Sequence, residues 1–380
     1  MSLIYWIFGS LLALYGIALG VLSGGFRRIR KDSDMVLPSR VSGVLPNVSI
    51  VVAARNEAEN LPGLISCLSL LEYPTEKFEI IVVDDRSDDA TWTILTETQH
   101  HYSNFKAFRI TDRLPEYAPK KRALDTGIRA ATGDIILLTD ADCLPPPTWV
   151  GGMIQYYRDS IQVVPGYSPY VFRASTPALV RGLLSLENYA NAAVAAASTG
   201  WGQPLTPTGT NLSYRRAAYL AAGGFEPIKT WVSGDDDLFM RHLAERKVGG
   251  FSYALDRGAH VPTFAPSSWR QFWNQRVRYG SKGRHHGPLV TLGVLAVFLL
   301  NVSLVAGAFA VLAGEASLLG PTVALWLLKA LMEFSFLASC APRFGETALL
   351  KYFPLAAILY PLYVSVFGFL GLFAKFRWKE

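Results

Sequence analysis

Residues 135–142 read IILLTDAD, in which four isoleucine or leucine residues precede a threonine and two aspartates. A short apolar run that ends in polar residues is typical of a strand buried on both faces of a sheet, here over 135–138. Asp140 and Asp142 follow it directly, and two carboxylates in this position could hold Mg²⁺ or Mn²⁺ together with substrate phosphates. By itself a D-x-D pattern is more often a solvated turn, so its meaning depends on the rest of the chain.

Three segments on the N-terminal side have the composition of buried strands: residues 47–53 (NVSIVVA), 78–83 (FEIIVV) and 105–110. Helices are predicted over residues 57–71, where leucine and isoleucine recur on one stripe, and over residues 121–131. Ser87 is predicted to cap the helix that follows the second strand. Strands that alternate with helices indicate an α/β fold with a mostly parallel sheet covered on both faces.

Polar side chains gather where these predicted strands end. Ligands of parallel α/β sheets bind beyond the carboxyl ends of the strands, which meet at one edge. Any one of the polar groups could be a turn or a helix cap, because Asp and Asn favour such positions. Three strand ends that deliver carboxylates to the same edge together indicate a binding site instead. These groups are Arg55, Asn56 and Glu57 after Ala53, then Asp84 and Asp85, and finally Asp140 and Asp142.

A second acidic group, residues 233–238 (SGDDDL), precedes another predicted helix. Carboxylates suit the positive end of a helix, so one of them is expected to act as an N-cap. Three consecutive aspartates exceed what a cap requires. Their mutual repulsion is expected to raise the pKa of at least one of them, which makes one of these aspartates a candidate general base.

The chain of 380 residues is 51% hydrophobic and only 17% charged, and so few charges cannot cover a soluble enzyme of this composition. Four apolar runs are each close to the ~20 residues that a membrane-spanning helix needs. They cover residues 4–22, 288–313, 316–341 and 352–374. The net charge of +6 indicates contact with membrane lipids and no nucleic-acid partner, because the basic residues gather beside these runs. The three cysteines are too far apart for a disulfide scaffold.

The basic segment 27–31 (RRIRK) follows the first apolar run, which predicts a retained helix, an outer N-terminus and a cytoplasmic domain. A cleaved signal peptide is the less favoured alternative, since its positive charges would precede the apolar run. Four crossings would place the basic tail, residues 375–380, outside, although its charges prefer the cytoplasm. Pro354 and Pro361 could break the last segment into a re-entrant element, so the number of crossings stays open.

The expected parts of the chain are a membrane helix (1–26), a basic juxtamembrane linker (27–46), a cytoplasmic α/β domain (47–265), an interfacial segment (266–287), a bundle of about three membrane segments (288–374) and a basic tail (375–380). The interfacial segment is rich in Trp and Arg, which suit a membrane surface. Gln275, Arg278 and Tyr279 could share a helical face there and reach a diphosphate. Lys329 and Glu333, four residues apart, could form a structural ion pair or a substrate contact.

Seven motifs follow one another along the chain: Ala53–Glu57 (AARNE), Asp84-Asp85, Lys120–Leu124 (KKRAL), Asp140-Ala141-Asp142, Gly209-Thr210-Asn211 with Arg215-Arg216, Gly234-Asp235-Asp236, and Gln275-x-x-Arg278-Tyr279. In this order they resemble the membrane-bound glycosyltransferase family 2, the group that contains cellulose, chitin, hyaluronan and poly-N-acetylglucosamine synthases. The resemblance covers residues 47–284 and the flanking membrane segments, and the ordered set is far more specific than any single motif. It implies the GT-A fold.

The resemblance also implies roles for individual residues. The nucleoside would lie at Asn56, Glu57 and Asp85, with Asp84 beside them, and Lys120 would face the nucleotide end of the donor. Asp140 would lie near the ribose and diphosphate, and Asp142 would coordinate Mg²⁺ or Mn²⁺. Asp235 would be the catalytic base, with Asp236 as the alternative. The remaining residues expected to contact substrate are Ala53, Arg55, Gly209, Thr210, Asn211, Gln275, Arg278 and Tyr279.

The implied activity is that of an inverting, metal-dependent glycosyltransferase, which uses a nucleotide-diphosphate sugar (a UDP sugar is expected first) and glycosylates a membrane lipid or a membrane-associated glycan. Two positions depart from the family pattern: Gly234 replaces a glutamate, and Tyr279 replaces a tryptophan that lies near the acceptor sugar in processive synthases. The second departure favours one or few additions over the main alternative, a processive polysaccharide synthase. More distant alternatives are a catalytically inactive membrane scaffold or transporter and a nucleotidyltransferase.

Overall fold

The computed structural model describes residues 2–34, 45–206, 209–231, 234–281 and 288–373. The chain divides into two compact units, which we describe separately. The sheet unit comprises Gly25–Val171 and Asn191–Ala265, and the helical unit comprises Met1–Gly24, Phe172–Ala190 and Pro266–Glu380. Two helices, α1 (Ser2–Asp34) and α6 (Ala178–Thr199), contribute residues to both units.

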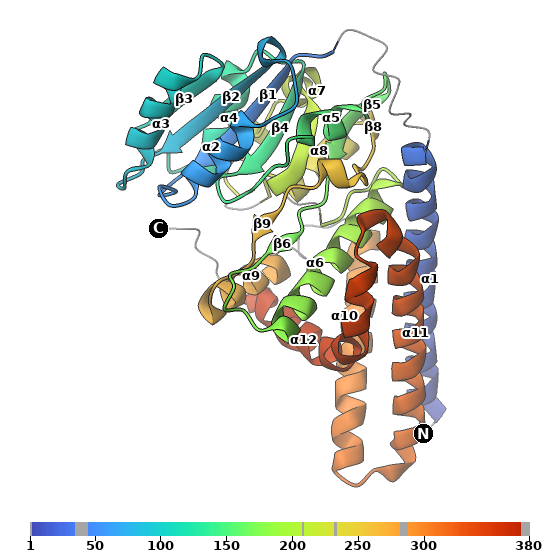
Figure 1. Cartoon of the computed structure of the whole chain (residues 1–380). Coiled ribbons are helices and arrows are strands. Elements are labelled where there is room, and N and C mark those ends of the chain that lie inside the picture. The colour runs from blue at the N-terminus through green and yellow to red at the C-terminus, as the bar shows by residue number, and fades with distance from the viewer. Residues whose placement is uncertain (1, 35–44, 207–208, 232–233, 282–287, 374–380) are drawn as a thin grey trace. The chain divides into compact units, whose positions relative to one another are not determined.

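The sheet unit is built on a seven-stranded sheet with the order β3-β2-β1-β4-β7-β5-β8 (Figure 1). The strands β3, β2, β1 and β4 run parallel, whereas β7 is antiparallel to both β4 and β5. The predicted α/β fold with a mostly parallel sheet is therefore confirmed, and the four predicted strands coincide with β1–β4 to within two residues. The strands of this sheet are β1 (Val48–Ala54), β2 (Phe78–Asp85), β3 (Phe105–Ile110), β4 (Ile135–Asp140), β5 (Ile161–Pro165), β7 (Leu212–Arg215) and β8 (Gly250–Phe251). A second sheet pairs β6 (Tyr170–Val171) with β9 (Thr263–Phe264).

The large sheet is covered on both faces because its residues alternate between two apolar cores. In β1, Ile50 and Val52 face a core that includes α2, α3 and α5, and Val51 between them faces the opposite core with α4, α7 and α8. A Cβ at Gly127 of α4 would lie 2.6 Å from Val51 Cγ1, so only glycine allows α4 to approach the sheet this closely. The helices are α2 (Leu61–Ser69), α3 (Thr91–His101), α4 (Pro119–Ala130), α5 (Trp149–Ile154), α7 (Arg216–Ala221) and α8 (Asp237–Glu245).

Two local predictions in the sheet unit are wrong. The helix predicted over residues 57–71 begins only at Leu61, because the preceding residues form the loop that leaves β1. Ser87 does not cap the next helix, which begins at Thr91 without a side-chain cap. The Ser87 hydroxyl instead accepts a hydrogen bond from the backbone N–H of Asn56, at 2.9 Å. Both corrections concern residues that tie two strand ends together.

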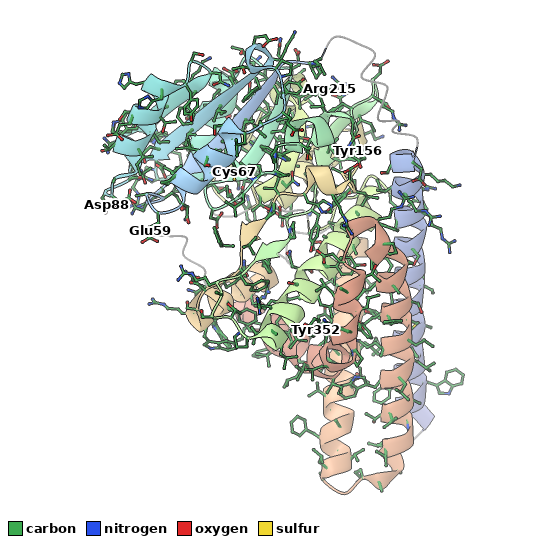
Figure 2. All side chains as sticks on the ribbon, viewed as in Figure 1. Glu59, Cys67, Asp88, Tyr156, Arg215 and Tyr352 are labelled. Carbon is green, nitrogen blue, oxygen red and sulfur yellow. The ribbon has the colours of Figure 1, made fainter. Side chains whose placement is uncertain are left out.

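Residues 27–34, the first part of the expected juxtamembrane linker, continue the helix α1. Gly25, two residues before this segment, touches α6 so closely that a Cβ there would lie 2.0 Å from the Ala197 carbonyl oxygen. The Arg28 guanidinium lies 3.7 Å from the centre of the Trp201 ring, a cation–π contact. The hydroxyl of Tyr156, which is labelled in Figure 2, lies 3.3 Å from the Ser33 hydroxyl. These contacts bind the end of α1 into the sheet unit.

Four helices of the described chain are long and apolar enough to cross a membrane: α1, α10 (Pro288–Leu312), α11 (Leu319–Phe344) and α12 (Phe353–Phe373). The predicted apolar runs correspond to these helices. The helical unit also contains α9 (Trp269–Ser281), which covers most of the predicted interfacial segment. In this unit Tyr352, labelled in Figure 2, packs against Gly182, where a Cβ would come within 2.3 Å of the tyrosine ring.

The break that Pro354 and Pro361 could have introduced into the last segment is absent from α12. Pro354 lies in the first turn of α12, where proline is tolerated, and the helix continues through Pro361. Pro361 has no N–H to donate to the carbonyl of Ala357, four residues earlier. The indole Nε1 of Trp326 in α11 donates to that carbonyl instead, at 2.8 Å. The proline is accommodated because a neighbouring helix replaces the missing donor.

Lys329 and Glu333 form the predicted ion pair, with 2.7 Å between Lys329 Nζ and Glu333 Oε1. The Tyr15 hydroxyl donates to the same carboxylate oxygen. The rings of Tyr15 and Tyr360 lie 5.8 and 5.2 Å from Lys329 Nζ, within cation–π range. The two charges are therefore compensated inside the helical unit, which favours the structural interpretation of this pair.

Glu79 of β2 holds the opposite end of the large sheet from the polar strand ends. Its Oε1 accepts hydrogen bonds from the Ser49 hydroxyl (2.6 Å) and from the N–H (2.6 Å) and hydroxyl (2.7 Å) of Thr132, while Lys106 Nζ lies 2.6 Å from Oε2. Burial alone would raise the pKa of Glu79, but these donors lower it from 4.5 to about 2. One carboxylate thus connects β1, β2, β3 and the loop before β4.

Replacing Glu79 with glutamine is expected to destabilise the chain by about 1–3 kcal/mol at neutral pH, because a buried network loses its charged acceptor. The folded-state pKa is lowered, so the carboxylate stabilises the fold fully above its unfolded pKa near 4.5, and this contribution is lost as pH falls toward about 2. Thermal unfolding of the full chain in detergent at several pH values measures both effects. Glu76→Gln makes the same change at an exposed site, and equal midpoints for the two variants near pH 7 would contradict this role.

Candidate active site

Lys120 joins two acidic segments at the carboxyl edge of the large sheet. It is the second residue of α4, and its Nζ lies 2.8 Å from Asp140 Oδ1 and 3.0 Å from Asp235 Oδ2. Asp140 ends β4, and Asp235 lies just before α8. The three side chains are only 18%, 28% and 12% exposed, so the cluster is largely shielded from water while remaining accessible.

The charge of Lys120 is set by its surroundings. Burial opposes a positive charge on the amine, but the carboxylates of Asp140 and Asp235 outweigh burial and raise the pKa of Lys120 above its ordinary value. Lys120 is therefore a cation at physiological pH. The structure gives Asp235 a cationic partner that the run of three aspartates did not predict.

The register of the strands places the other polar groups at the same edge. β1 lies between β2 and β4, with Ala54 paired to Asp84 and Ala53 paired to Asp140. Two strand spacings separate Asp84 from Asp140, about 10 Å between backbones. The prediction that three strand ends share one edge is confirmed by this register.

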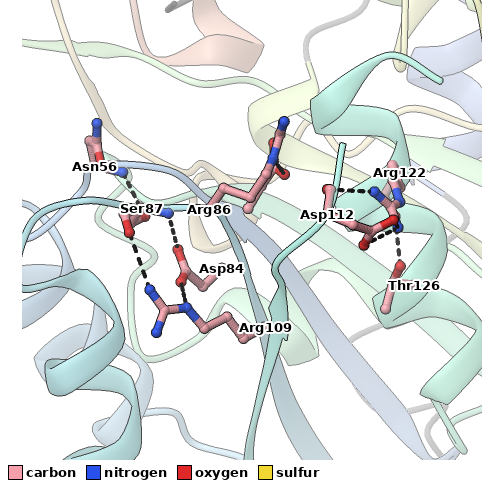
Figure 3. A network of polar contacts seen from close by, with 9 residues as sticks. Asn56, Asp84, Arg86, Ser87, Arg109, Asp112, Arg122 and Thr126 are labelled. Atoms are coloured by element: carbon pink, nitrogen blue, oxygen red, sulfur yellow. Dashed lines mark hydrogen bonds and ion pairs between the residues drawn. The ribbon is translucent and has the colours of Figure 1, made fainter. Parts of the chain in front are cut away.

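Two aspartates at the end of β2 have different partners, and Figure 3 shows Asp84 with its partners Arg109 and Ser87. Asp84 is fully buried, with Arg109 Nε 3.1 Å from its Oδ2 and the Ser87 N–H donating to its Oδ1 at 3.2 Å. Asp85 accepts two hydrogen bonds from the Arg86 guanidinium, at 2.8 and 3.0 Å. Asp84 therefore fixes the loop, whereas Asp85, which is also buried at 3% exposed, is paired with the partly exposed guanidinium of Arg86.

Asn56 and Glu57 connect the loops after β1 and β2. Asn56 has a left-handed backbone conformation (φ 54°), and its Oδ1 accepts the N–H of Asp88 at 3.0 Å. The Glu57 N–H donates to the Thr91 hydroxyl at 2.8 Å, and the Glu57 carboxylate accepts from the Asn60 amide at 2.7 Å. These contacts give both residues a role in shaping the edge, alongside the substrate contact that the sequence predicts. Neighbouring Arg55 is partly exposed in the same loop.

The Gly209-Thr210-Asn211 motif separates into residues with different roles. A Cβ at Gly209 would lie 3.1 Å from Asp235 Oδ2 and 3.7 Å from Lys120 Nζ. This glycine therefore lies against the contact between Lys120 and Asp235. The Thr210 hydroxyl donates to the Ser168 hydroxyl at 2.8 Å.

Asn211 requires a correction, because its side chain is completely buried and its amide is used by the protein. Its nitrogen donates to the carbonyls of Tyr167 (3.1 Å) and Ala259 (2.8 Å), and its oxygen accepts from the Trp149 indole (3.1 Å). The expected substrate contact is replaced by a structural role, because this amide links three segments beneath Gly209.

The aspartates of the acidic group before α8 have different roles. Asp236 is the N-cap of α8, as expected for one of these aspartates, and its carboxylate accepts the N–H groups of Asp237 (2.7 Å) and Gly209 (3.3 Å). Asp235 is the member that faces Lys120. Gly234 has φ +95°, and a Cβ there would lie 2.4 Å from Leu238 Cδ1, so the turn requires glycine where the resembling family has glutamate.

Asp140 and Asp142 are chemically suited to a divalent cation. Asp142 lies in the tight turn after β4, in which the Cys143 N–H donates to the Asp140 carbonyl at 3.2 Å. Within the described part of the chain, no group of three or more His, Cys, Asp or Glu residues is arranged to hold an ion alone. Two carboxylates fit the type of Mg²⁺ site that is completed by substrate phosphates and water.

Gln275, Arg278 and Tyr279 all lie on α9, in the helical unit, so the predicted helix at this motif is present. The Gln275 Oε1 atom is buried and has no hydrogen-bond partner among the described residues. The side chains of Arg278 and Tyr279 lie outside the described residues.

Sequence reasoning missed three basic residues at this edge. Arg86 and Arg109 pair with Asp85 and Asp84, and the adjacent D-D-R letters were the only signal for Arg86. Lys121, beside Lys120, is 1% exposed and donates to the carbonyls of Ile228 (2.9 Å) and Trp231 (2.7 Å). The two consecutive lysines therefore have separate tasks, one at the carboxylates and one in holding a loop.

Residues 49–220 match the family described as Glycosyl transferase family 2. The chain is 26% identical over 295 residues to Probable glycosyltransferase YdaM of Bacillus subtilis (strain 168), covering 73% of this chain and 64% of that protein. It is 35% identical over 125 residues to Beta-monoglucosyldiacylglycerol synthase of Nostoc sp. (strain PCC 7120), covering 33% of this chain and 25% of the relative. It is 32% identical over 121 residues to Undecaprenyl-phosphate 4-deoxy-4-formamido-L-arabinose transferase of Pectobacterium carotovorum, covering 32% and 36%. The matches thus span less than two thirds of the length of these relatives.

Among solved structures, the chain is similar to mannosyltransferase PcManGT from Pyrobaculum calidifontis, solved in complex with GDP-Man and Mn²⁺. The TM-score is 0.56 at 21% identity, and the likeness covers 93% of this chain and 99% of that chain. This likeness concerns the fold, and it confirms the predicted GT-A fold. The family match confirms the predicted glycosyltransferase family 2 domain.

Replacing Gly209 with alanine is expected to slow sugar transfer by about 10- to 100-fold, because the new methyl group would displace the Asp235 carboxylate or Lys120 from its position. The thermal midpoint should change little. Gly151→Ala is the matched control, since a Cβ there meets nothing within 4 Å. Equal transfer rates for the two variants would show that Gly209 does not border the reacting groups.

Proposed function

We propose that this chain transfers a sugar from a nucleotide-diphosphate donor to a membrane lipid or a membrane-associated glycan, because residues 49–220 match the family described as Glycosyl transferase family 2. A UDP sugar is the first donor to test, and the transfer inverts the anomeric configuration. The observation that carries the proposal is the lysine bridge, in which Lys120 lies between Asp140 at the end of β4 and Asp235 before α8. This arrangement supplies an acid–base carboxylate and a cation within one cluster.

The nucleoside end of the donor is assigned to the edge formed by β1 and β2. Asp85 and Arg86 together offer hydrogen-bond acceptors and donors there, which suits the edge of a nucleobase or a ribose. Arg55 and the backbone of Ala53, Asn56 and Glu57 border the same edge. The buried Asp84–Arg109 pair supports this wall from below.

Asp140 and Asp142 would hold Mg²⁺ or Mn²⁺ at the diphosphate. When bound, such an ion supplies charge neutralisation for the leaving diphosphate. Lys120 contributes positive charge beside Asp140. Thr210 and Gly209 border the same space through the contacts described above.

Asp235 is proposed to act as the general base. Its carboxylate accepts the proton of the acceptor hydroxyl while that oxygen bonds to the anomeric carbon and the bond from that carbon to the diphosphate breaks. The attack comes from the face opposite the leaving group, so one displacement inverts the configuration. Lys120 holds the carboxylate oriented for this proton transfer, because its Nζ contacts Asp235 Oδ2.

The acceptor is proposed to be membrane-bound because four helices of the described chain have the length and composition of membrane spans. The names of two relatives, a diacylglycerol glucoside synthase and an undecaprenyl-phosphate transferase, support a lipid acceptor. The basic residues after the first apolar run support a cytoplasmic location for the catalytic domain. Tyr279 and the small number of spans support one or few additions over processive synthesis.

Replacing Asp235 with asparagine is expected to reduce transfer by about 100-fold or more while donor binding persists, because an amide cannot accept the proton. The assay screens purified chain in detergent against a panel of nucleotide sugars and measures nucleoside-diphosphate release and product formation. Asp237→Asn, two residues away, serves as the control. Full activity of Asp235→Asn would refute the assignment, and loss confined to Asp236→Asn would transfer the role to the N-cap aspartate.

A chelator is expected to abolish transfer, and Mn²⁺ or Mg²⁺ is expected to restore it. Asp142→Asn should raise the metal concentration for half-maximal activity by about tenfold or more, because one of two carboxylate ligands is lost. Asp159→Asn, at an exposed position, is the control. Unchanged activity in the chelator, with metal content checked by mass spectrometry, would contradict the metal assignment.

A further inference from the structure

Arg86 has a backbone conformation that residues with a Cβ rarely adopt. It directly follows β2, and its φ is 56°, in the left-handed region that favours glycine. Two contacts hold it there: its own N–H donates to the Ile110 carbonyl at 3.2 Å, and the N–H of Ser87 donates to the buried Asp84 carboxylate at 3.2 Å. A long side chain kept on an unfavourable backbone conformation indicates a function for that side chain.

The Arg86 guanidinium covers the Asp85 carboxylate. Its Nε lies 2.8 Å from Asp85 Oδ1 and its Nη2 lies 3.0 Å from Oδ2, so each carboxylate oxygen accepts a hydrogen bond. The Asp85 side chain is only 4% exposed, whereas that of Arg86 is 19% exposed. A ligand at this edge therefore meets the guanidinium before it meets the carboxylate.

The guanidinium keeps hydrogen-bond donors for such a ligand. An arginine side chain carries five N–H groups, and Asp85 takes two of those of Arg86. The Nη1 atom donates to none of the described residues. Because the paired contact fixes the plane of the guanidinium, the remaining N–H groups have a set direction.

The position of Arg86 is inside the edge formed by β1 and β2. Ala54 of β1 pairs with Asp84, two residues before Arg86, and the Asn56 N–H donates to the Ser87 hydroxyl, one residue after it (Figure 3). All of these residues belong to the sheet unit. The guanidinium and the loop after β1 therefore border the same space.

We propose that Arg86 is a specificity-determining residue of the donor site, where its guanidinium donates hydrogen bonds to a carbonyl oxygen of the nucleobase. Asp85 is then a positioning residue, which acts on the nucleobase through Arg86. The inference rests on the proposed function, in which the nucleoside of the donor lies at the edge formed by β1 and β2.

A guanidinium distinguishes two classes of nucleobase. It has donors and no acceptor, so it favours a carbonyl oxygen and disfavours an amino group at the same ring position. Uracil and guanine carry a carbonyl where cytosine and adenine carry an amino group. The expected donors are therefore sugars of uridine or guanosine diphosphate. An ion pair that merely held the loop would make no such distinction.

The first test replaces Arg86 with lysine in the full chain and measures the dissociation constants of UDP, CDP, GDP and ADP in detergent with Mn²⁺. The wild-type chain should prefer UDP to CDP, or GDP to ADP, by about tenfold or more, because only the carbonyl accepts a charge-assisted hydrogen bond. Lysine keeps a positive charge beside Asp85 but lacks the planar fork, so the preference should fall to about threefold or less.

Arg129→Lys is the matched control. Arg129 also pairs with an aspartate, with 2.8 Å between its Nε and Asp125 Oδ2, but it lies near the other end of α4. Its nucleotide preference should equal that of the wild-type chain. A second variant, Asp85→Asn/Arg86→Gly, guards against misfolding, because it strands no charge and glycine adopts the left-handed conformation freely. It should keep the thermal midpoint and lose the preference.

The assignment would be overturned by a wild-type chain that binds CDP as tightly as UDP and ADP as tightly as GDP. An unchanged preference in Arg86→Lys, or in the double variant, would also overturn it and leave the Arg86–Asp85 pair as a loop contact. Failure of the proposed function has a different signature. In that case the wild-type chain would bind none of the four nucleotides and would transfer no sugar from any donor in the panel.

Discussion

The contact on which the candidate site depends is the bridge from Lys120 to Asp140 and Asp235. A shielded lysine at the start of α4 requires anionic partners, and the sheet supplies one from the end of β4 and one from the turn before α8. The surrounding backbone is adapted to this contact. Gly209 leaves room beside the Asp235 carboxylate, and Gly234 adopts the left-handed turn that directs Asp235 toward the lysine.

The parts of this arrangement that follow from local pattern could be predicted from the sequence. Apolar runs such as 135–138 specify buried strands, and parallel strands necessarily bring their acidic ends to one edge. Contacts between distant segments could not be predicted in this way. The sequence pattern suggests that the Asn211 amide binds a ligand. In the structure this amide makes hydrogen bonds with three buried residues from elsewhere in the sheet unit. Which of Lys120 and Lys121 meets the carboxylates depends on the phase of α4, which a boundary error of one residue would reverse.

The membrane segments show the same division. Their apolar composition identified four helices, but composition does not determine where a helix ends. α1 continues through a basic segment because Arg and Lys are good helix formers and because Gly25 and Arg28 pack on α6 and Trp201. The sequence likewise did not predict that Glu187 of α6 accepts hydrogen bonds from Arg276 of α9 and Tyr363 of α12. A single glutamate in an alanine-rich helix carries no local signal for such partners.

The Trp326 indole of α11 donates to the Ala357 carbonyl, which Pro361 of α12 leaves without a backbone donor. Trp326 and Pro361 therefore depend on each other. If position 361 were proline and position 326 had no donor, the carbonyl of residue 357 would have no hydrogen-bond partner. If position 361 were not proline, its N–H would bond that carbonyl, and the indole at 326 would lose its acceptor. Related chains should therefore keep or exchange the two residues as a unit. Covariation between these positions would record the pairing of the two helices even where overall similarity has faded.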